Sequence, residues 1–179
     1  SPPAVSGPDA AVIRPEAIDQ LDYEAELAVV IGRTARAVSA AAATEYIAGY
    51  TALNDISGRD AQFGDGQFFR GKSYDTFAPM GPTLVPTTAL DPAALAVSST
   101  VNGEQRQAST TAELIFDVPT LIAYISAITT LEPGDVISTG TPGGVGVHRD
   151  PPALLTPGDT VAVTVEGVGT LRNRVVVAE

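Results

Sequence analysis

The sequence predicts an α+β domain in which curved mixed β-sheets carry a few peripheral helices. Short apolar segments separated by Pro- and Gly-containing turns run along the whole chain, which favours a sheet-rich fold. Two helical segments stand apart from each other, and the strands and helices do not alternate as a doubly wound parallel sheet requires. The 179 residues suit a single domain, so we expect one domain over residues 1–179.

The strands are predicted where apolar runs lie between turn residues. The strongest one covers residues 26–31 and ends at Gly32. Others are predicted over residues 82–86, 95–101, 136–139, 161–166 and 171–177. Asn102-Gly103 is a strong hairpin signal, so the strand at 95–101 should return through residues 105–107.

Two helices are predicted from capping residues and apolar spacing. Ser39 is expected to cap a helix over residues 40–46, with Gly49 near its end. Asp117 is expected to cap a second helix that has Pro119 in its first turn. Its apolar face should comprise Leu121, Ile122, Ile125 and Ile128. We interpret residues 63–69 as a loop and residues 1–8 as an extended segment.

Composition and charge exclude several classes of function. The net charge of -11 would repel a phosphate backbone or an anionic membrane, so we expect no nucleic-acid or membrane partner. The chain has no cysteine, which excludes disulfides, thiolate metal sites and cysteine nucleophiles. No apolar run reaches the ~20 residues of a membrane span, and no basic, apolar leader opens the chain. A cytoplasmic protein is the expectation.

Two acidic residues open the strongest predicted strand. Glu24 and Glu26 are two apart, so in a strand their carboxylates lie on one face. A cation between them would relieve their repulsion, and Asp55 is a plausible third ligand. Carboxylate oxygens select hard cations, so we expect Mg²⁺ or Mn²⁺, with Ca²⁺ as an alternative. The competing interpretation is a solvated sheet edge without a metal.

Several sequence blocks resemble the fumarylacetoacetate hydrolase family, in the same order along the chain. They are residues 22–32 (DYEAELAVVIG), 49–51 (GYT) with 54–60 (NDISGRD), 70–75 (RGKSYD), 101–104 (VNGE) and 134–142 (GDVISTGTP). The resemblance covers nearly the whole chain. It implies a mixed β-sheet roll, a homodimer and a Mg²⁺ or Mn²⁺ site formed by Glu24, Glu26 and Asp55.

The resemblance also implies roles for other residues. Lys72, the sole lysine of the chain, would stabilise a developing enolate beside the metal; otherwise it is a surface lysine. Arg59 and Gln62 would contact substrate oxygens, although Arg59 could instead pair with Asp60 or another acid. Thr141, in a Gly-rich stretch, would offer a hydroxyl to the substrate or simply form a tight turn.

The function expected first is metal-dependent hydrolysis of a C–C bond in an acylpyruvate- or fumarylpyruvate-type 2-oxo acid, in the manner of enzymes of aromatic catabolism. Hydrolysis needs a base, which in the family is a His paired with a Glu on an upstream lid, and residues 1–179 contain no such segment. Decarboxylation of an oxaloacetate-type acid or isomerisation of a 2-hydroxymuconate-type acid is the alternative. Outside the enzymes, the alternative is a module that binds metal and carboxylate.

Overall fold

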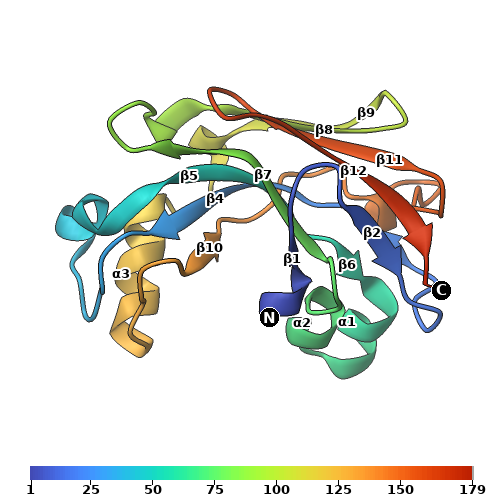
Figure 1. Ribbon diagram of the computed structural model, residues 1–179, viewed down its shortest axis with the longest axis horizontal. Coiled ribbons are helices and arrows are strands. Elements are labelled where there is room, and N and C mark those ends of the chain that lie inside the picture. Colours follow the sequence, from blue (N-terminus) through green and yellow to red (C-terminus); the bar gives the residue numbers. More distant parts are fainter. Residues whose placement is uncertain (179) are drawn as a thin grey trace.

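Two five-stranded sheets lie one above the other in the computed structural model, which describes residues 1–178 (Figure 1). The first sheet has the order β1 (Val5–Ser6), β7 (Ala78–Pro86), β5 (Ile47–Asn54), β4 (Ala25–Ile31), β10 (Val136–Ser138). The second has the order β2 (Ala11–Arg14), β12 (Gly169–Val177), β11 (Thr160–Val165), β8 (Ala96–Val101), β9 (Glu104–Thr110). β1–β7 and β2–β12 pair in parallel and the other neighbours antiparallel, so both sheets are mixed as predicted.

Short elements surround the sheets. β3 (Leu21–Asp22) pairs with β6 (Ser57–Gly58). The α-helices are α1 (Arg59–Asp65), α2 (Phe68–Lys72) and α3 (Val118–Ile128). The 3₁₀ helices are η1 (Pro2–Ala4), η2 (Ala40–Tyr46), η3 (Pro92–Ala94), η4 (Thr111–Glu113) and η5 (Gly146–His148). α3 packs against η2 at one end of the molecule, whereas α1 and α2 lie together beside β6 (Figure 1).

The strand β4 lies inside the first sheet, between β5 and β10, and is buried along nearly all of its length. Ala25, Leu27, Val29 and Ile31 belong to the larger apolar core, which continues into the second sheet through residues such as Val163. Because side chains alternate along a strand, Glu26 projects from the opposite face. The apolar residues of β4 therefore anchor a strand that carries a carboxylate on its other side.

Most of the predicted elements are confirmed. Each predicted strand lies within or overlaps an observed one, and Asn102 and Gly103 form the tight turn of the β8–β9 hairpin. Both have positive φ angles, 52° and 83°, as a type I′ turn requires. The Asp117 carboxylate accepts a hydrogen bond of 2.9 Å from the backbone N–H of Thr120, which confirms the predicted cap of α3.

The predicted helix after Ser39 is wrong in two respects. Residues 40–46 form a 3₁₀ helix, and Ser39 makes no side-chain capping bond. Gly49 lies within β5, a strand that was not predicted, rather than near a helix end. Its role is close approach of two strands, since a Cβ there would lie 2.4 Å from the carbonyl oxygen of Val85 in β7.

Other expectations for surface segments are also wrong. The expected loop at 63–69 is occupied by α1 and α2, which are separated only by Gly66 and Gln67. Gly64 and Gly66 gave this segment the composition of a loop, and its helices are too short to show a clear apolar period. Residues 1–8 contain η1 and β1. In α3, Ile122 is buried as expected, but Ile128 is 67% exposed.

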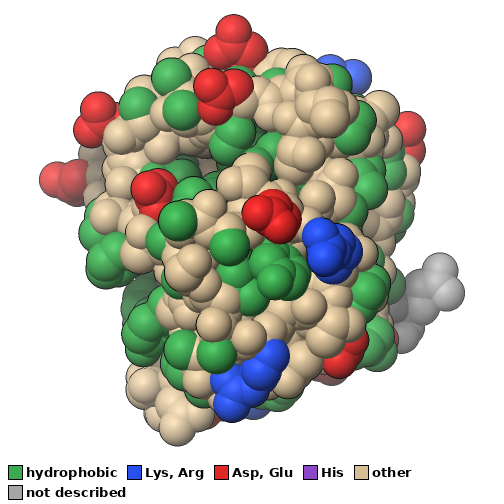
Figure 2. Space-filling model, turned by 90° about the vertical axis from the view of Figure 1, so that its left-hand side faces the viewer, with side chains coloured by type: hydrophobic (Ala, Val, Ile, Leu, Met, Phe, Trp, Pro, Cys, Tyr) green, Lys and Arg blue, Asp and Glu red, His purple; other side chains and the backbone are tan. Residues whose placement is uncertain are grey.

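Apolar side chains also lie on the surface. The segment before α3 exposes Ile115 and Phe116, and α3 itself exposes Tyr124 and Ile128. Figure 2 views the end of the molecule at which η2 and α3 lie, and it shows separate groups of apolar side chains with acidic and basic ones among them. Within residues 1–178, no helix has the length and apolar character needed to cross a bilayer.

Candidate metal centre and active site

Three carboxylates meet where β4 begins and β5 ends. Each of Glu24, Glu26 and Asp55 offers an oxygen within 4.8 Å of the other two. The antiparallel register explains the arrangement, because Ala25 of β4 lies opposite Asn54 of β5. The backbone N–H of Asp55 donates to the carbonyl of Glu24 at 2.9 Å, which fixes the two chain segments together. The predicted ligand set is therefore assembled in one place.

Lys72, the last residue of α2, lies against this cluster. Its Nζ donates to Glu24 Oε2 at 2.9 Å and to Ser57 Oγ at 3.0 Å, and it also contacts Asp55 Oδ2. Burial alone would lower the pKa of the Lys72 ammonium, but the charges of Asp55 and Glu24 outweigh burial and raise it. The side chain is therefore a cation fixed beside the carboxylates, not a solvated surface lysine.

Glu26 is the most deeply placed of the three carboxylates. It is 3% exposed, and it accepts hydrogen bonds from Ser138 Oγ and from the backbone N–H of Gly140, the latter at 2.8 Å. Burial, followed by the nearby charge of Asp55, raises the pKa of Glu26 to about 7. The hydrogen bonds from Ser138 and Gly140 offset only part of this effect.

The residues present fit a divalent cation. Burial also raises the pKa of Asp55, despite the opposing charge of Lys72. With Asp22 included, four carboxylates face the two cations Arg59 and Lys72, which leaves two formal negative charges when all are ionised. One divalent cation would balance them, and an all-oxygen donor set favours Mg²⁺ or Mn²⁺.

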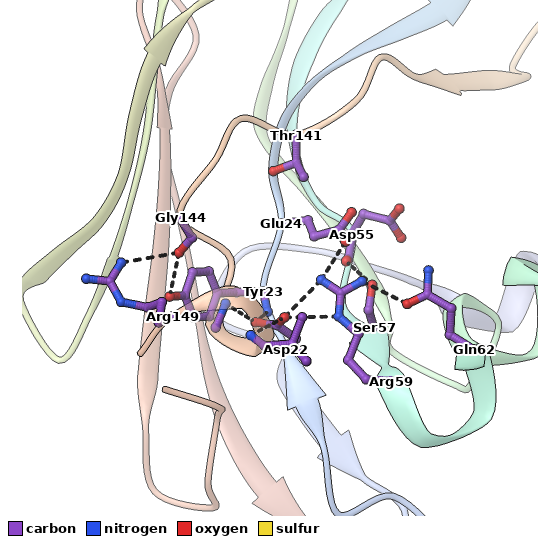
Figure 3. Close-up of polar contacts among 12 residues, drawn as sticks. Asp22, Tyr23, Glu24, Asp55, Ser57, Arg59, Gln62, Thr141, Gly144 and Arg149 are labelled. Atoms are coloured by element: carbon purple, nitrogen blue, oxygen red, sulfur yellow. Dashed lines mark hydrogen bonds and ion pairs between the residues drawn. The ribbon is translucent and has the colours of Figure 1, made fainter. Parts of the chain in front are cut away.

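Arg59 connects this cluster to Asp22 and Gln62 (Figure 3). Its Nε and NH2 groups hold Asp22 Oδ2 at 3.0 and 2.9 Å, and NH2 also contacts Glu24 Oε1 at 2.7 Å. Its predicted alternative partner Asp60 instead accepts the backbone N–H groups of Asp19 and Gln20. NH1 donates to Gln62 Oε1 at 2.8 Å, so every nitrogen of the Arg59 guanidinium has a protein partner.

The contact with Arg59 orients the amide of Gln62. A guanidinium only donates, so Gln62 must present its carbonyl oxygen to Arg59. Its amide nitrogen then points away from Arg59, as Figure 3 shows. Gln62 is thus available as a donor, which is the role predicted for it.

Asp22 was not predicted as a site residue. Its fully buried carboxylate accepts a hydrogen bond from Arg59 Nε, forms an ion pair with Arg59 NH2, and accepts the backbone N–H groups of Gly146 and Val147 at 2.7 and 3.0 Å. It therefore ties η5 to the acidic cluster. Its position two residues before Glu24, in the same alternation as Glu24 and Glu26, was the only signal in the sequence.

Thr141 follows β10, and its hydroxyl already has two protein partners. It donates to the carbonyl of Ala25 at 3.0 Å and accepts from Gln107 Nε2 at 2.8 Å. Thr141 also borders a cavity of about 470 Å³, with apolar walls that include Leu114, Ile115, Phe116 and Pro142. Substrate contact by Thr141 stays a prediction, and the cavity beside it has room for a small organic group.

A comparison with known families identifies the family of this chain. The family profile described as "Fumarylacetoacetate (FAA) hydrolase C-terminal" matches residues 1–176. The chain belongs to the fumarylacetoacetate hydrolase family. The resemblance found in the sequence blocks is thereby confirmed.

Relatives in this family carry several names. Oxaloacetate tautomerase YisK of Bacillus subtilis is 47% identical over 89% of this chain and 54% of its own length. The mitochondrial oxaloacetate tautomerase Fahd2a of Rattus norvegicus is 43% identical over 97% of this chain and 56% of its own length. The chain thus spans little more than half of these two relatives.

Solved structures support the same fold. A 5-carboxymethyl-2-hydroxymuconate delta-isomerase from Mycobacterium smegmatis superposes with a TM-score of 0.92 at 46% identity, covering 99% of this chain and 67% of that protein. A fumarylacetoacetate hydrolase from Exiguobacterium antarcticum superposes with a TM-score of 0.96 at 44% identity, covering 99% and 65%. The predicted mixed-sheet fold of this family is confirmed.

Proposed function

We propose that this chain carries the active site of a divalent-metal-dependent tautomerase or isomerase of small 2-oxo acids, of the oxaloacetate type. The observation that carries enolate chemistry at this site is Lys72, a fixed ammonium in direct contact with Glu24 and Asp55, and the choice of tautomerisation rests on the names of relatives. Relatives with the tautomerase name, at 43% and 47% identity, point to the same chemistry. Isomerisation was the alternative in the sequence-based prediction, and it is preferred here to hydrolysis.

Keto–enol interconversion moves one proton between the 2-oxo oxygen and the carbon attached to the carbonyl carbon. Negative charge develops on the 2-oxo oxygen when the carbon proton leaves. A cation held by Glu24, Glu26 and Asp55 would supply Lewis-acid polarisation of the substrate's oxygens. The Lys72 ammonium lies where it can neutralise the same developing charge, and fixed charges of this kind are typically the largest single catalytic contribution.

Neighbouring residues would orient the substrate. The Gln62 amide nitrogen would donate to a substrate oxygen, because Arg59 holds the carbonyl end of the amide. Arg59 would add a positive charge beside the site, while its nitrogens stay with Asp22, Glu24 and Gln62. The cavity beside Thr141, whose walls include Leu114 and Pro142, would receive the part of the substrate that does not react.

Hydrolysis of a C–C bond is the second candidate. The observation that favours it is the structural neighbour named fumarylacetoacetate hydrolase, with its TM-score of 0.96. Both reactions pass through an enolate, so the same cations serve either one. They differ in whether water attacks a carbonyl of the substrate.

The test is a pair of assays with Mg²⁺ or Mn²⁺ and with chelator. Enol-to-ketone conversion of oxaloacetate is followed by loss of the enol absorbance, and cleavage of an acylpyruvate by loss of the diketone. We expect chelator-sensitive acceleration of the oxaloacetate conversion. Lys72→Met should abolish the acceleration, and Lys72 is suited to this test because the chain has no other lysine.

Other assay results would favour a different function. Chelator-sensitive cleavage of acylpyruvate without tautomerisation would favour the hydrolase. Release of CO₂ from oxaloacetate would favour a decarboxylase. Binding of oxalate with Mg²⁺ but no turnover of either substrate would favour a binding module and contradict the proposed activity.

A further inference from the structure

Gln107 of β9 is a buried amide with every hydrogen-bonding position engaged. It is 1% exposed. Its Oε1 accepts from the backbone N–H of Ala25 at 3.0 Å and from Ser99 Oγ at 2.9 Å. Its Nε2 donates to Thr141 Oγ1 at 2.8 Å and to the carbonyl of Pro142 at 2.9 Å. A buried amide with four partners has one defined orientation and little freedom to move.

These four bonds join three separate parts of the molecule. Gln107 and Ser99 belong to the second sheet, Ala25 to the first sheet, and Thr141 and Pro142 to the segment after β10. Ala25 lies between the ligands Glu24 and Glu26 in the sequence. The carbonyl end of the amide therefore holds the strand that carries the carboxylates, and the nitrogen end holds the segment that carries Thr141.

The packing around Gln107 leaves the segment after β10 little room to shift. Gly144 has a φ of 109°, and a Cβ on it would lie 2.3 Å from the carbonyl oxygen of Arg106 and 3.3 Å from Gln107 Cγ. The Tyr23 hydroxyl donates to the carbonyl of Gly144 at 3.0 Å (Figure 3). The segment is thus fastened to β9 at one point and to the residue before Glu24 at another.

We propose that Gln107 is a positioning residue that sets the place of Thr141 relative to the metal-binding carboxylates. It makes no hydrogen bond to the metal-binding carboxylates and acts through two bonds at each end of its amide. The inference rests on the proposed use of the site for a 2-oxo acid. The carbonyl end of the amide then supports metal binding, and the nitrogen end supports substrate binding.

Gln107→Glu tests the carbonyl end and the nitrogen end of the amide separately. The carboxylate keeps the acceptor for Ala25 and Ser99, but it cannot donate to Thr141 and it repels the carbonyl of Pro142. The probes are Mn²⁺ alone and then oxalate on the Mn²⁺-loaded protein, both measured by calorimetry. Mn²⁺ affinity should stay within about threefold of wild type, whereas the loss of two hydrogen bonds should weaken oxalate binding at least about tenfold.

The matched control is Gln105→Glu, the same change two residues away on β9 at an exposed position. It should leave both affinities unchanged. Gln107→Met fills the same space without any polar group, so it should weaken Mn²⁺ and oxalate together, and it provides a second variant if the buried carboxylate impairs folding. Thermal denaturation checks that each variant is folded.

A double-mutant cycle tests whether Gln107 acts through Thr141. In a Thr141→Val background, Gln107→Glu should weaken oxalate binding by clearly less than it does in wild type, because the shared bond is already absent. Equal losses of Mn²⁺ and oxalate affinity in Gln107→Glu, or full additivity with Thr141→Val, would overturn the inference. A wild-type protein that binds Mn²⁺ but no oxalate would contradict the proposed function as well, which distinguishes the two failures.

Discussion

Glu26→Gln should stabilise the metal-free protein at alkaline pH while removing its response to metal. The pKa of Glu26 is raised from 4.5 to about 7 in the folded protein, mainly by burial. Between these values the folded protein holds a proton that the unfolded chain has released. The free energy of unfolding is therefore highest below pH 4.5, and it falls as the pH rises from 4.5 through 7. The difference corresponds to about 3 kcal/mol, at about 1.4 kcal/mol per pKa unit.

The assay is urea unfolding in the presence of chelator at several values from pH 4.5 to pH 8. The glutamine does not titrate, so the free energy of unfolding of the wild type relative to Glu26→Gln should fall by about 3 kcal/mol over this range. Mn²⁺ added at pH 8 should stabilise the wild type and have little effect on the variant. Glu45→Gln, at an exposed position of η2, is the control and should show neither effect.

A constant difference between wild type and Glu26→Gln at every pH would refute the reasoning. It would mean that the folded protein accommodates the ionised carboxylate without cost. Stabilisation of Glu26→Gln by Mn²⁺ to the wild-type extent would remove Glu26 from the ligand set.

Three further predictions concern Lys72, α3 and assembly. Lys72→Met should retain Mn²⁺ binding but lower kcat by about 10²-fold or more, because a fixed cation beside the developing charge is lost; near-wild-type turnover would exclude it from the chemistry. Asp117→Ala should lower the free energy of unfolding by about 1 kcal/mol at pH 7, measured by chemical unfolding. Hydrogen bonds from Thr120 lower the pKa of Asp117 in the folded protein. The difference between the variant and the wild type should therefore vanish as the pH falls through this lowered pKa and Asp117 becomes protonated. The predicted homodimer should give twice the 18.3 kDa chain mass in light scattering, and a monomer mass would contradict it.

Only the Glu24 and Glu26 pair could be predicted from local geometry, and Asp55 was recognised through a family block because β5, which places it, was not predicted. The alternation of a strand places Glu24 and Glu26 on one face, and Asp55 lies one residue beyond the strand that pairs with theirs. Lys72 was recognisable because it is the sole lysine within a family block. The spacing of Glu24 and Glu26 lies within one short segment, which the sequence displays directly, whereas Asp55 and Lys72 depended on the family resemblance.

Residues that support the site from a distance could not be predicted. Gln107 reaches Ala25 across 82 residues, and Ser138 reaches Glu26 across 112. These contacts depend on how one sheet lies over the other and on which strand borders β4, and neither is fixed by local periodicity. The helices α1 and α2 were missed for a different reason, since their glycines resemble a loop and only a single turn of each packs inward.

The hydroxyl of Thr141 has a fixed polarity. Its single hydrogen is directed to the carbonyl of Ala25, and one lone pair is taken by the Gln107 amide. What it can still offer is the other lone pair, and any group that meets it must bring its own hydrogen. An enol hydroxyl or a water molecule satisfies this condition directly, whereas a ketone oxygen or an ionised carboxylate, such as those of oxalate, meets it only through a bridging water. The buried amide behind Thr141 thereby makes this point of the site selective for the protonated form of an oxygen.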